Sequence, residues 1–285
     1  MNPLLRDLLR GYRVLGIRPV SGGDINQAYR VDTPDGPVFA KCHPEPKPDM
    51  FARESASLRA LRACTSDELG VPEVLAETSH GLVLEWIEPG RGRPGGEAAF
   101  GVGLAGVHRC RGASFGGLGG ELAGYLGSVE VDLSPTGSWA EFFFTRRVRA
   151  LTERAVAQGV VSPRALPLLE RIAPRAAELC GPPEPPALLH GDLWAGNRMV
   201  DTTGRSWLID PAAHWGHREY DLAMMRLFGG FGAEAFAAYH EAFPLAEGWA
   251  SRVRWYQLPP LLVHAILFGG GYGEAVLAVL SDYGS

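Results

Sequence analysis

The segment Pro-Gly-Arg-Gly-Arg-Pro-Gly-Gly at residues 89–96 divides this chain into two stretches with different hydrophobic patterns. Proline and glycine at this density do not continue a helix or a strand, so we expect a linker here. The residues before it alternate short apolar runs with turn signals, whereas those after it repeat apolar residues at helical spacing. The length of 285 residues suits about two packing units. We therefore predict a strand-rich part at 1–88 and a mainly helical part at 97–285.

The first part is predicted to hold an antiparallel sheet and one amphipathic helix. Strands are expected at 13–20, 26–32 and 37–42, the helix at 50–63, and two more strands at 73–77 and 81–86. The turn signal Thr33-Pro34-Asp35-Gly36 joins the second and third strands, which favours a meander.

The second part is predicted to be helical with one interruption. Helices are expected at 97–109, 138–158 and 163–180, and several after residue 218, including an apolar one at 251–268. Residues 187–212 break this pattern, because the short β runs RMVD and SWLID flank a Thr-Thr-Gly turn. A small hairpin is therefore expected among the helices.

Charge and cysteine usage narrow the class of partner. With 27 basic and 32 acidic residues the net charge is −5, which gives no basic field for nucleic acid or anionic lipid. No charge-free apolar run reaches the roughly 18 residues of a membrane span, and charged residues interrupt the leucines of the N-terminus. Four dispersed cysteines without a CxxC pair encode neither a zinc knuckle nor a thioredoxin-like site (Cys42, Cys64, Cys110, Cys180). A reducing cytoplasm fits these cysteines best, so we expect a cytoplasmic protein with reduced cysteines and without nucleic-acid or membrane partners.

The interrupting segment carries the residues best suited to chemistry. Asp192 is followed five residues later by Asn197, and Asp210 ends the second hairpin run. Phosphoryl transfer needs one carboxylate to orient a hydroxyl, and an amide with a second carboxylate to hold magnesium. Each residue alone could merely cap a turn or a helix. All three in this order favour phosphoryl transfer.

The first part offers the matching half of such a site. Gly22 and Gly23 lie in a turn between strands, where small residues let backbone N–H groups approach a phosphate, although an ordinary hairpin turn would look the same. Lys41 closes the third strand, as does the lysine that grips nucleotide phosphates in protein kinases. Glu54, in the following helix, is placed to be its ion-pair partner.

The order of these parts resembles the aminoglycoside phosphotransferase and choline kinase branch of the protein-kinase-like fold. Within that branch the chain most resembles the fructosamine kinase (ketosamine-3-kinase) family. The resemblance rests on LLHGDLWAGN at 188–197, IDPA at 209–212, GHREYDLAMMRLFGGF at 216–231, YQLPPLLVHAILFGGGY at 256–272, and Trp139, Phe142, Phe143 and Arg146 in WAEFFFTRR. It implies an α+β fold with two lobes: a small antiparallel nucleotide-binding lobe with one main helix at 1–88, a hinge at 89–96, and a larger helical lobe at 97–285 with the catalytic loop and acceptor site.

The resemblance also implies an activity. Such a kinase uses ATP and Mg²⁺ to phosphorylate the third-carbon hydroxyl of a ketosamine, on a small molecule or a glycated protein amine. The phosphate ester then eliminates and frees the amine, which is deglycation and protein repair. Asp192 would be the catalytic carboxylate, Asn197 and Asp210 would hold Mg²⁺, and Lys41 with Glu54 would position the phosphates. Glu85, Trp86 and Ile87 would form the hinge that hydrogen-bonds adenine.

Other residues have competing interpretations. Trp194 either stacks on the acceptor sugar or packs in the core, and His264 is either a satisfied core histidine or a substrate contact. Glu219 and Asp221 are expected to brace the catalytic loop through buried hydrogen bonds, and His190 to orient it. His214 and His217 form an HxxH pair without the companion ligands of a zinc site.

Two other functions stay open on the sequence. A phosphotransferase for an aminoglycoside, choline or homoserine would share every catalytic residue, and an acid-lined acceptor site would favour a polycationic substrate. A nucleotide-binding pseudokinase is less compatible, because Lys41, Asp192, Asn197 and Asp210 are all retained. Many relatives have a cysteine in the glycine turn where this chain has Asp24, so no redox switch is expected there.

Overall fold

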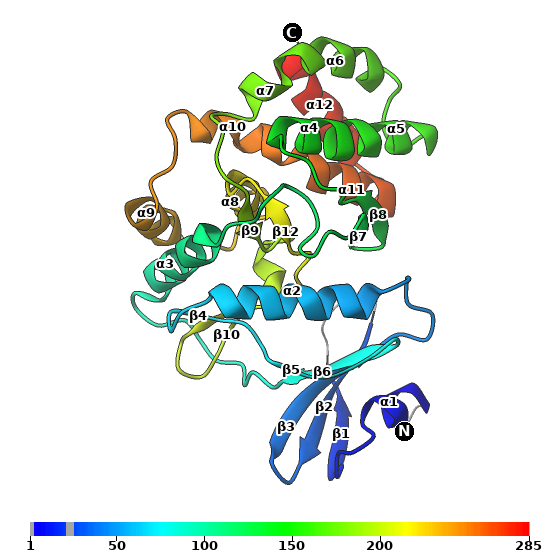
Figure 1. Cartoon of the computed structure of the whole chain (residues 1–285), viewed down its shortest axis with the longest axis vertical. Helices are drawn as coiled ribbons and strands as arrows, with labels where there is room; N and C mark the ends of the chain where they lie inside the picture. The colour runs from blue at the N-terminus through cyan, green and yellow to red at the C-terminus, as the bar shows by residue number, and fades with distance from the viewer. Residues whose placement is uncertain (1–2, 21–25, 285) are drawn as a thin grey trace.

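The computed structural model describes residues 3–20 and 26–284. They form an α+β structure in which an antiparallel sheet occupies the N-terminal part and helices dominate the C-terminal part (Figure 1). This confirms the fold class expected from the sequence.

Five antiparallel strands build the N-terminal sheet. Their order is β1 (Gly16–Pro19), β2 (Gln27–Thr33), β3 (Gly36–Cys42), β6 (Gly81–Glu85) and β5 (Val74–Thr78). Consecutive strands β1, β2 and β3 are neighbours, so the predicted meander is confirmed.

Two helices cover opposite faces of this sheet. The short helix α1 (Pro3–Leu8) packs with Cys42 and Val83, whereas α2 (Met50–Cys64) packs with Leu82 and Leu84. Successive residues of a strand face opposite sides, so Lys41 of β3 faces α2. In Figure 1, α2 lies between the sheet and the helical part. The sheet face that carries Lys41 is thus the one directed towards the second part of the chain.

The helical part packs around an aromatic core. Trp139 lies in this core with Phe142, Phe143 and Tyr256, and its indole N–H donates a hydrogen bond to the Tyr256 hydroxyl at 3.0 Å. The helices are α3 (Gly96–Arg109), α4 (Trp139–Phe143), α5 (Ala150–Ala157), α6 (Ala165–Ile172), α7 (Ala176–Leu179), α8 (Glu219–Leu227), α9 (Ala233–Ala242), α10 (Trp249–Tyr256), α11 (Leu258–Phe268) and α12 (Tyr272–Gly284). Across residues 3–20 and 26–284, no helix combines the length and apolarity needed to cross a membrane.

Three of the predicted helices are interrupted, and the one expected at 251–268 divides at Gln257 into α10 and α11. Residues 138–158 form α4, a π-helical segment η1 (Phe144–Arg149) and α5. A π turn holds more residues than an α turn and rotates every later side chain, so a fixed helical period does not predict it. Residues 163–180 break into α6, a 3-10 turn (Ala173–Arg175) and α7, because Pro174 has no N–H to continue the helical bonding.

The expected hairpin at 187–212 is present and receives a third strand from the N-terminal part. Strands β10 (Arg198–Val200) and β11 (Ser206–Leu208) pair antiparallel, and β4 (Leu69–Gly70) pairs parallel with β11. Strand β9 (Ala187–Leu189) pairs separately with β12 (His214–Gly216). Residues 190–213, which lie between β9 and β12 in the chain, are therefore anchored at both ends by this pairing.

Several elements were not predicted. They are α1, β4, β9, β12 and the hairpin of β7 (Ala123–Leu126) and β8 (Val129–Asp132). The hairpin had a sequence signal, since Gly127-Ser128 separates two short alternating runs and Gly127 adopts a φ of +57°.

Two of the four dispersed cysteines form a disulfide. Cys64 ends α2 and Cys110 directly follows α3, and their sulfurs are bonded although 46 residues separate them. The carbonyl of Cys110 also accepts from Leu188 N–H at 3.1 Å, so the bond ties α2 to the strand that leads into the catalytic loop. This pairing was not predicted, and it departs from our expectation of reduced cysteines.

Candidate active site

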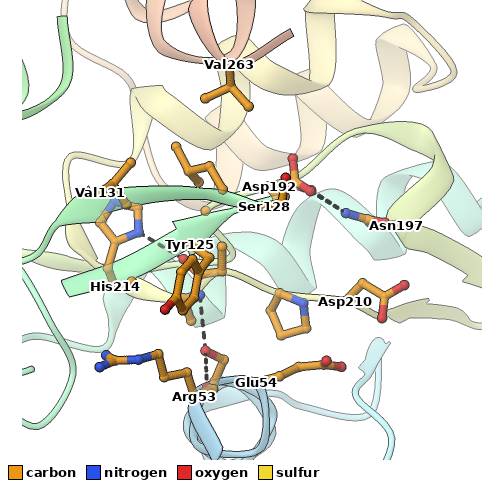
Figure 2. A pocket seen from close by; sticks show the side chains of 18 of the residues that line it. Arg53, Glu54, Tyr125, Ser128, Val131, Asp192, Asn197, Asp210, His214 and Val263 are labelled. Carbon is orange, nitrogen blue, oxygen red and sulfur yellow. Dashed lines mark hydrogen bonds between the residues drawn. The ribbon is translucent and has the colours of Figure 1, made fainter. Parts of the chain in front are cut away.

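Residues 190–197 form a loop at the junction of the two parts. The amide nitrogen of Asn197 donates to the backbone oxygen and to Oδ2 of Asp192, both at 2.9 Å (Figure 2). A short 3-10 turn (Ala195–Asn197) brings Asn197 back to this position. The five-residue spacing read from the sequence thus corresponds to a direct side-chain contact.

A fully buried carboxylate from α8 holds the start of this loop. Asp221 accepts from the backbone N–H groups of His190 at 2.7 Å and Gly191 at 2.9 Å. Gly191 has a φ of +81°, and a Cβ there would collide with the carbonyl of Ala212, so glycine is required. The prediction that Asp221 braces the loop is confirmed.

The matching prediction for Glu219 is wrong. Its carboxylate pairs instead with Arg252 of α10, at 2.6 and 2.8 Å. His190 does orient the loop, because Nδ1 accepts from Asp192 N–H at 3.2 Å while Nε2 donates to the Ile209 carbonyl at 3.0 Å.

The carboxylate of Asp192 is more basic than usual. Burial raises its pKa to about 6, and the nearby Asp210 and Asp221 act in the same direction against the hydrogen bond from Asn197. At neutral pH the group is ionised yet close enough to neutrality to accept a proton. This is the property that general-base or orienting chemistry requires.

Lys41 forms ion pairs with both Glu54 of α2 and Asp210. Its side chain is buried, which alone would lower its pKa, but Asp210 and Glu54 outweigh burial and the pKa is raised. In turn the charge of Lys41 holds the pKa of Asp210 below its usual value. The structure thus joins the sheet, α2 and the end of the hairpin through one buried cation.

A cavity of about 570 Å³ opens between α2, the catalytic loop, the β7–β8 hairpin and α11 (Figure 2). The predicted site residues that line it are Lys41, Glu54, Asp192, Trp194, Asn197, Asp210 and His264. Gly22 and Gly23 lie outside the described residues. Glu85, Trp86 and Ile87, at the end of β6 and just beyond, do not line it.

Trp194 is not a core residue. It is 41% exposed and its ring meets Phe228 edge-on, with the ring centroids 6.3 Å apart. His264 lies on the other side of Phe228, at 4.9 Å between centroids, and its Nδ1 donates to the Pro260 carbonyl at 2.7 Å. An accessible aromatic wall therefore stands beside Asp192.

The segment at 85–87 is held by side chains on both sides. Glu85 accepts from the Arg62 guanidinium at 3.2 Å and from Glu73 N–H at 3.1 Å. The indole N–H of Trp86 donates to Glu88 at 2.9 Å. The backbone N–H of the buried Ile87 has no hydrogen-bond partner within residues 3–20 and 26–284.

Several cavity residues were not predicted as site residues, among them an arginine, a histidine and a tyrosine that are buried. Arg147, His214 and Tyr220 line the cavity, and each is at most 3% exposed. Of the two arginines in WAEFFFTRR, Arg147 lines the cavity, whereas Arg146, one of the residues that carry the family resemblance, approaches Asp132 and Glu141 outside it. His214 and Tyr220 lie in segments already noted, but the sequence does not show that their side chains face Asp192.

Comparison with known proteins assigns this arrangement to a family. The sequence model of the family described as fructosamine kinase matches residues 4–283. A probable ketoamine kinase of Enterococcus faecium is 37% identical over 288 residues, which cover 99% of each chain. A chloroplastic protein-ribulosamine 3-kinase of Oryza sativa subsp. indica is 31% identical over 95% of this chain and 79% of its own.

Solved structures agree with this assignment. A candidate fructosamine-3-kinase of Thermobifida fusca is 34% identical, with a TM-score of 0.90 over 99% of both chains. The aminoglycoside phosphotransferase APH(4)-Ia shares the fold alone, at 15% identity and a TM-score of 0.64 over 98% of this chain and 97% of its own. The match over nearly the whole length makes this chain an ATP-dependent phosphotransferase that belongs to the fructosamine kinase family.

Proposed function

We propose that this enzyme transfers the γ-phosphoryl group of ATP to the third-carbon hydroxyl of a ketosamine. The observation that carries the proposal is the accessible Trp194 beside the partly buried Asp192 in one cavity. The names of the relatives, ketoamine kinase and protein-ribulosamine 3-kinase, support the same substrate class.

Asp192 orients the acceptor hydroxyl and takes its proton as the oxygen attacks the γ-phosphorus. The bond from the γ-phosphorus to its bridging oxygen breaks, and ADP leaves. The raised pKa of Asp192 supports this role, since a stronger base accepts a proton more readily.

Asn197 and Asp210 are the residues that would hold Mg²⁺. The amide nitrogen of Asn197 is engaged with Asp192, which leaves Oδ1 as the free donor atom, and Asp210 adds a carboxylate. This oxygen-only donor set fits Mg²⁺. The ion, when bound, neutralises charge on the transferring phosphate.

Lys41 positions the nucleotide phosphates, and Glu54 fixes the direction of its side chain through their ion pair. The segment Glu85, Trp86 and Ile87 receives adenine through its backbone. The unpartnered N–H of Ile87 supports this role, because a buried donor needs an acceptor.

The acceptor sugar stacks on Trp194, and His264 offers its free Nε2 from α11. The acidic residues lining the cavity are Glu54, Glu121, Asp192 and Asp210, and three of these belong to the phosphate-transfer machinery. The acceptor side instead carries the cation Arg147, which disfavours a polycationic aminoglycoside.

Elimination of the phosphate ester from the product frees the amine, so the cellular role is deglycation and repair of amines in the cytoplasm. A panel assay tests the proposal: ATP consumption with fructosamine, ribulosamine, kanamycin and choline, together with release of the free amine. We expect turnover with a ketosamine that needs Mg²⁺ and is lost in Asp192→Asn. Turnover with kanamycin or choline but no ketosamine would overturn the proposal.

A further inference from the structure

Arg147 is a buried cation that lines the cavity, and Asp132 acts on it electrostatically. It is 2% exposed, and within residues 3–20 and 26–284 no carboxylate lies within ion-pair distance of its guanidinium. Its Nη1 donates to the carbonyl of Asp132 at 2.5 Å and to that of Arg146 at 3.4 Å. Its Nε and Nη2 have no hydrogen-bond partner in the same residues, although Arg147 lines the cavity.

The guanidinium stays charged in this position. Burial lowers the pKa of Arg147, but only to about 10, so it is protonated at neutral pH. Phe142 supports it, with the guanidinium carbon 4.6 Å from the ring centroid. Leaving a buried cation unpaired is costly, so a ligand that supplies a negative charge would be strongly favoured.

Two further polar groups face the same end of the cavity. His214 lies 5.9 Å from Phe142 and 6.0 Å from Tyr220 between ring centroids. The Tyr220 hydroxyl has no hydrogen-bond partner in the described parts of the chain, and Tyr220 lines the cavity. It adds a second free donor near Arg147.

His214 contributes an acceptor instead. Its Nδ1 donates to the Ala212 carbonyl at 3.0 Å, as the dashed line in Figure 2 shows. Burial lowers its pKa to about 4, with Arg147 acting in the same direction, so the ring is neutral and Nε2 accepts. The group of three thus combines donors for an anion with one acceptor for an N–H.

The free edge of Arg147 identifies the anion. Nε and Nη2 form the side of a guanidinium that binds two oxygens of one planar carboxylate. A phosphate dianion would leave charge uncompensated against a single cation. We infer that Arg147, with Tyr220, forms a carboxylate subsite in the acceptor cavity, and that the preferred acceptors are ketosamines built on the α-amino group of an amino acid.

A ketosamine of this kind offers a partner to Arg147, Tyr220 and His214 together. Its secondary amine is protonated at neutral pH and lies two bonds from the carboxylate carbon, so it can donate to His214 while the carboxylate binds Arg147. Its sugar hydroxyl remains free to reach Asp192, which lines the same cavity. This inference rests on the proposed function and specifies the amine half of its substrate.

A matched pair of substrates tests it: the fructose ketosamine of glycine, which has the carboxylate, and that of glycinamide, which does not. We expect the wild-type enzyme to favour the glycine compound by about 10- to 100-fold in kcat/KM, the range for hydrogen bonds to a charged group. Arg147→Gln should reduce this ratio to near 1. Arg146→Gln removes the neighbouring arginine outside the cavity and should leave the ratio unchanged.

The other outcomes are decisive as well. If Arg147→Gln does not fold, Tyr220→Phe deletes only the second donor and should lower the same ratio about 3- to 10-fold. Equal kcat/KM for both compounds in the wild-type enzyme would overturn the carboxylate subsite while leaving the ketosamine kinase activity in place. A preference for the glycinamide compound with a phosphate on carbon 6 of its sugar would also overturn the carboxylate subsite, because a phosphate would then be the favoured anion. Absence of turnover with every ketosamine would overturn the proposed function itself.

Discussion

The amide nitrogen of Asn197 lies 2.9 Å from Oδ2 of Asp192, and this contact joins the two ends of the catalytic loop. Because the nitrogen is used here, the oxygen of the same amide is the atom left for a metal. One side chain therefore fixes the position of the Asp192 carboxylate and presents an amide oxygen beside it. The five-residue spacing between Asp192 and Asn197 in the sequence makes both the contact and the position of the amide oxygen possible.

Asp192→Asn should lower turnover by about 10²–10⁴-fold, because the variant keeps the shape of the side chain but cannot take the hydroxyl proton. Circular dichroism and a thermal melt should show an intact fold. Asp201→Asn is a matched control, since Asp201 caps the hairpin turn through Thr203 and does not line the cavity. Unchanged turnover in Asp192→Asn would refute its assignment.

Lys41→Ala and Cys42→Ser should separate the two faces of β3. Lys41 faces α2 and Asp210, whereas Cys42 is buried under α1. We expect the lysine variant to lose most ATP turnover, while the cysteine variant keeps its turnover and loses about 1–2 kcal/mol of stability from a buried hydroxyl. A larger loss of turnover in Cys42→Ser would mean that this face of the strand acts on the site.

Three buried histidines should lower the stability as the pH drops below about 6.5, whereas the raised pKa values of Glu54 and Asp192, about 7 and about 6, act in the opposite direction. Burial lowers the pKa of His190, His214 and His217, that of His214 to about 4. The unfolded chain therefore binds protons that the folded protein excludes, and protonation favours unfolding. His214 alone should cost about 1 kcal/mol by pH 5.5.

Urea unfolding at pH 7.5, 6.5 and 5.5 measures this slope. His214→Gln should be less stable at pH 7.5 than the wild-type protein and should lose less stability on acidification. Equal changes of the unfolding free energy with pH in the wild-type protein and in His214→Gln would contradict the buried, neutral state of the His214 ring.

The bond between Cys64 and Cys110 should stabilise the protein by about 2–4 kcal/mol, because it closes a long loop in the unfolded chain. Non-reducing mass spectrometry should find the linked peptides. A reductant should lower the melting temperature of the wild-type protein but not that of Cys64→Ser. Equal responses of the two proteins would show that the bond does not form.

Much of the fold followed from local patterns. Strand alternation and the turn at 33–36 predicted the meander. The helical period gave wrong helix bounds at Pro174 and at the π turn, where the regular α-helix is interrupted. Long-range pairing was invisible, because nothing in the local sequence links Leu69–Gly70 to β11. Elements of two to four residues leave too few positions for a period to be recognised.

The site residues likewise divide into those that a local sequence pattern predicted and those that depend on long-range packing. Asp192, Asn197 and Asp210 share one short segment, so their spacing predicted their proximity. Arg147 and Tyr220 reach the cavity from separate helical segments, and an extra residue in a π turn decides which of two adjacent arginines faces inwards. The chemistry of a loop is read from sequence more readily than the walls of a cavity.

Trp194→Ala tests the acceptor wall. If the indole stacks on the sugar, its removal should cost about 1–3 kcal/mol of substrate binding and raise KM for the ketosamine, while ATP affinity stays unchanged. At 41% exposure the ring contributes little to the core, so the melting temperature should fall only slightly. Complete burial would instead predict a loss of about 3–5 kcal/mol in stability.

Gly196→Ala offers an independent approach to the same ring. A Cβ at this position would collide with the six-membered ring of Trp194, so the side chain must move while its chemistry stays intact. We expect KM for the ketosamine to rise in this variant too.

A large fall in melting temperature with an unchanged KM in Trp194→Ala would refute the sugar-stacking role. Acceptor binding would then depend on His264 and on the buried end of the cavity around Arg147, where the glycine and glycinamide compounds would still differ.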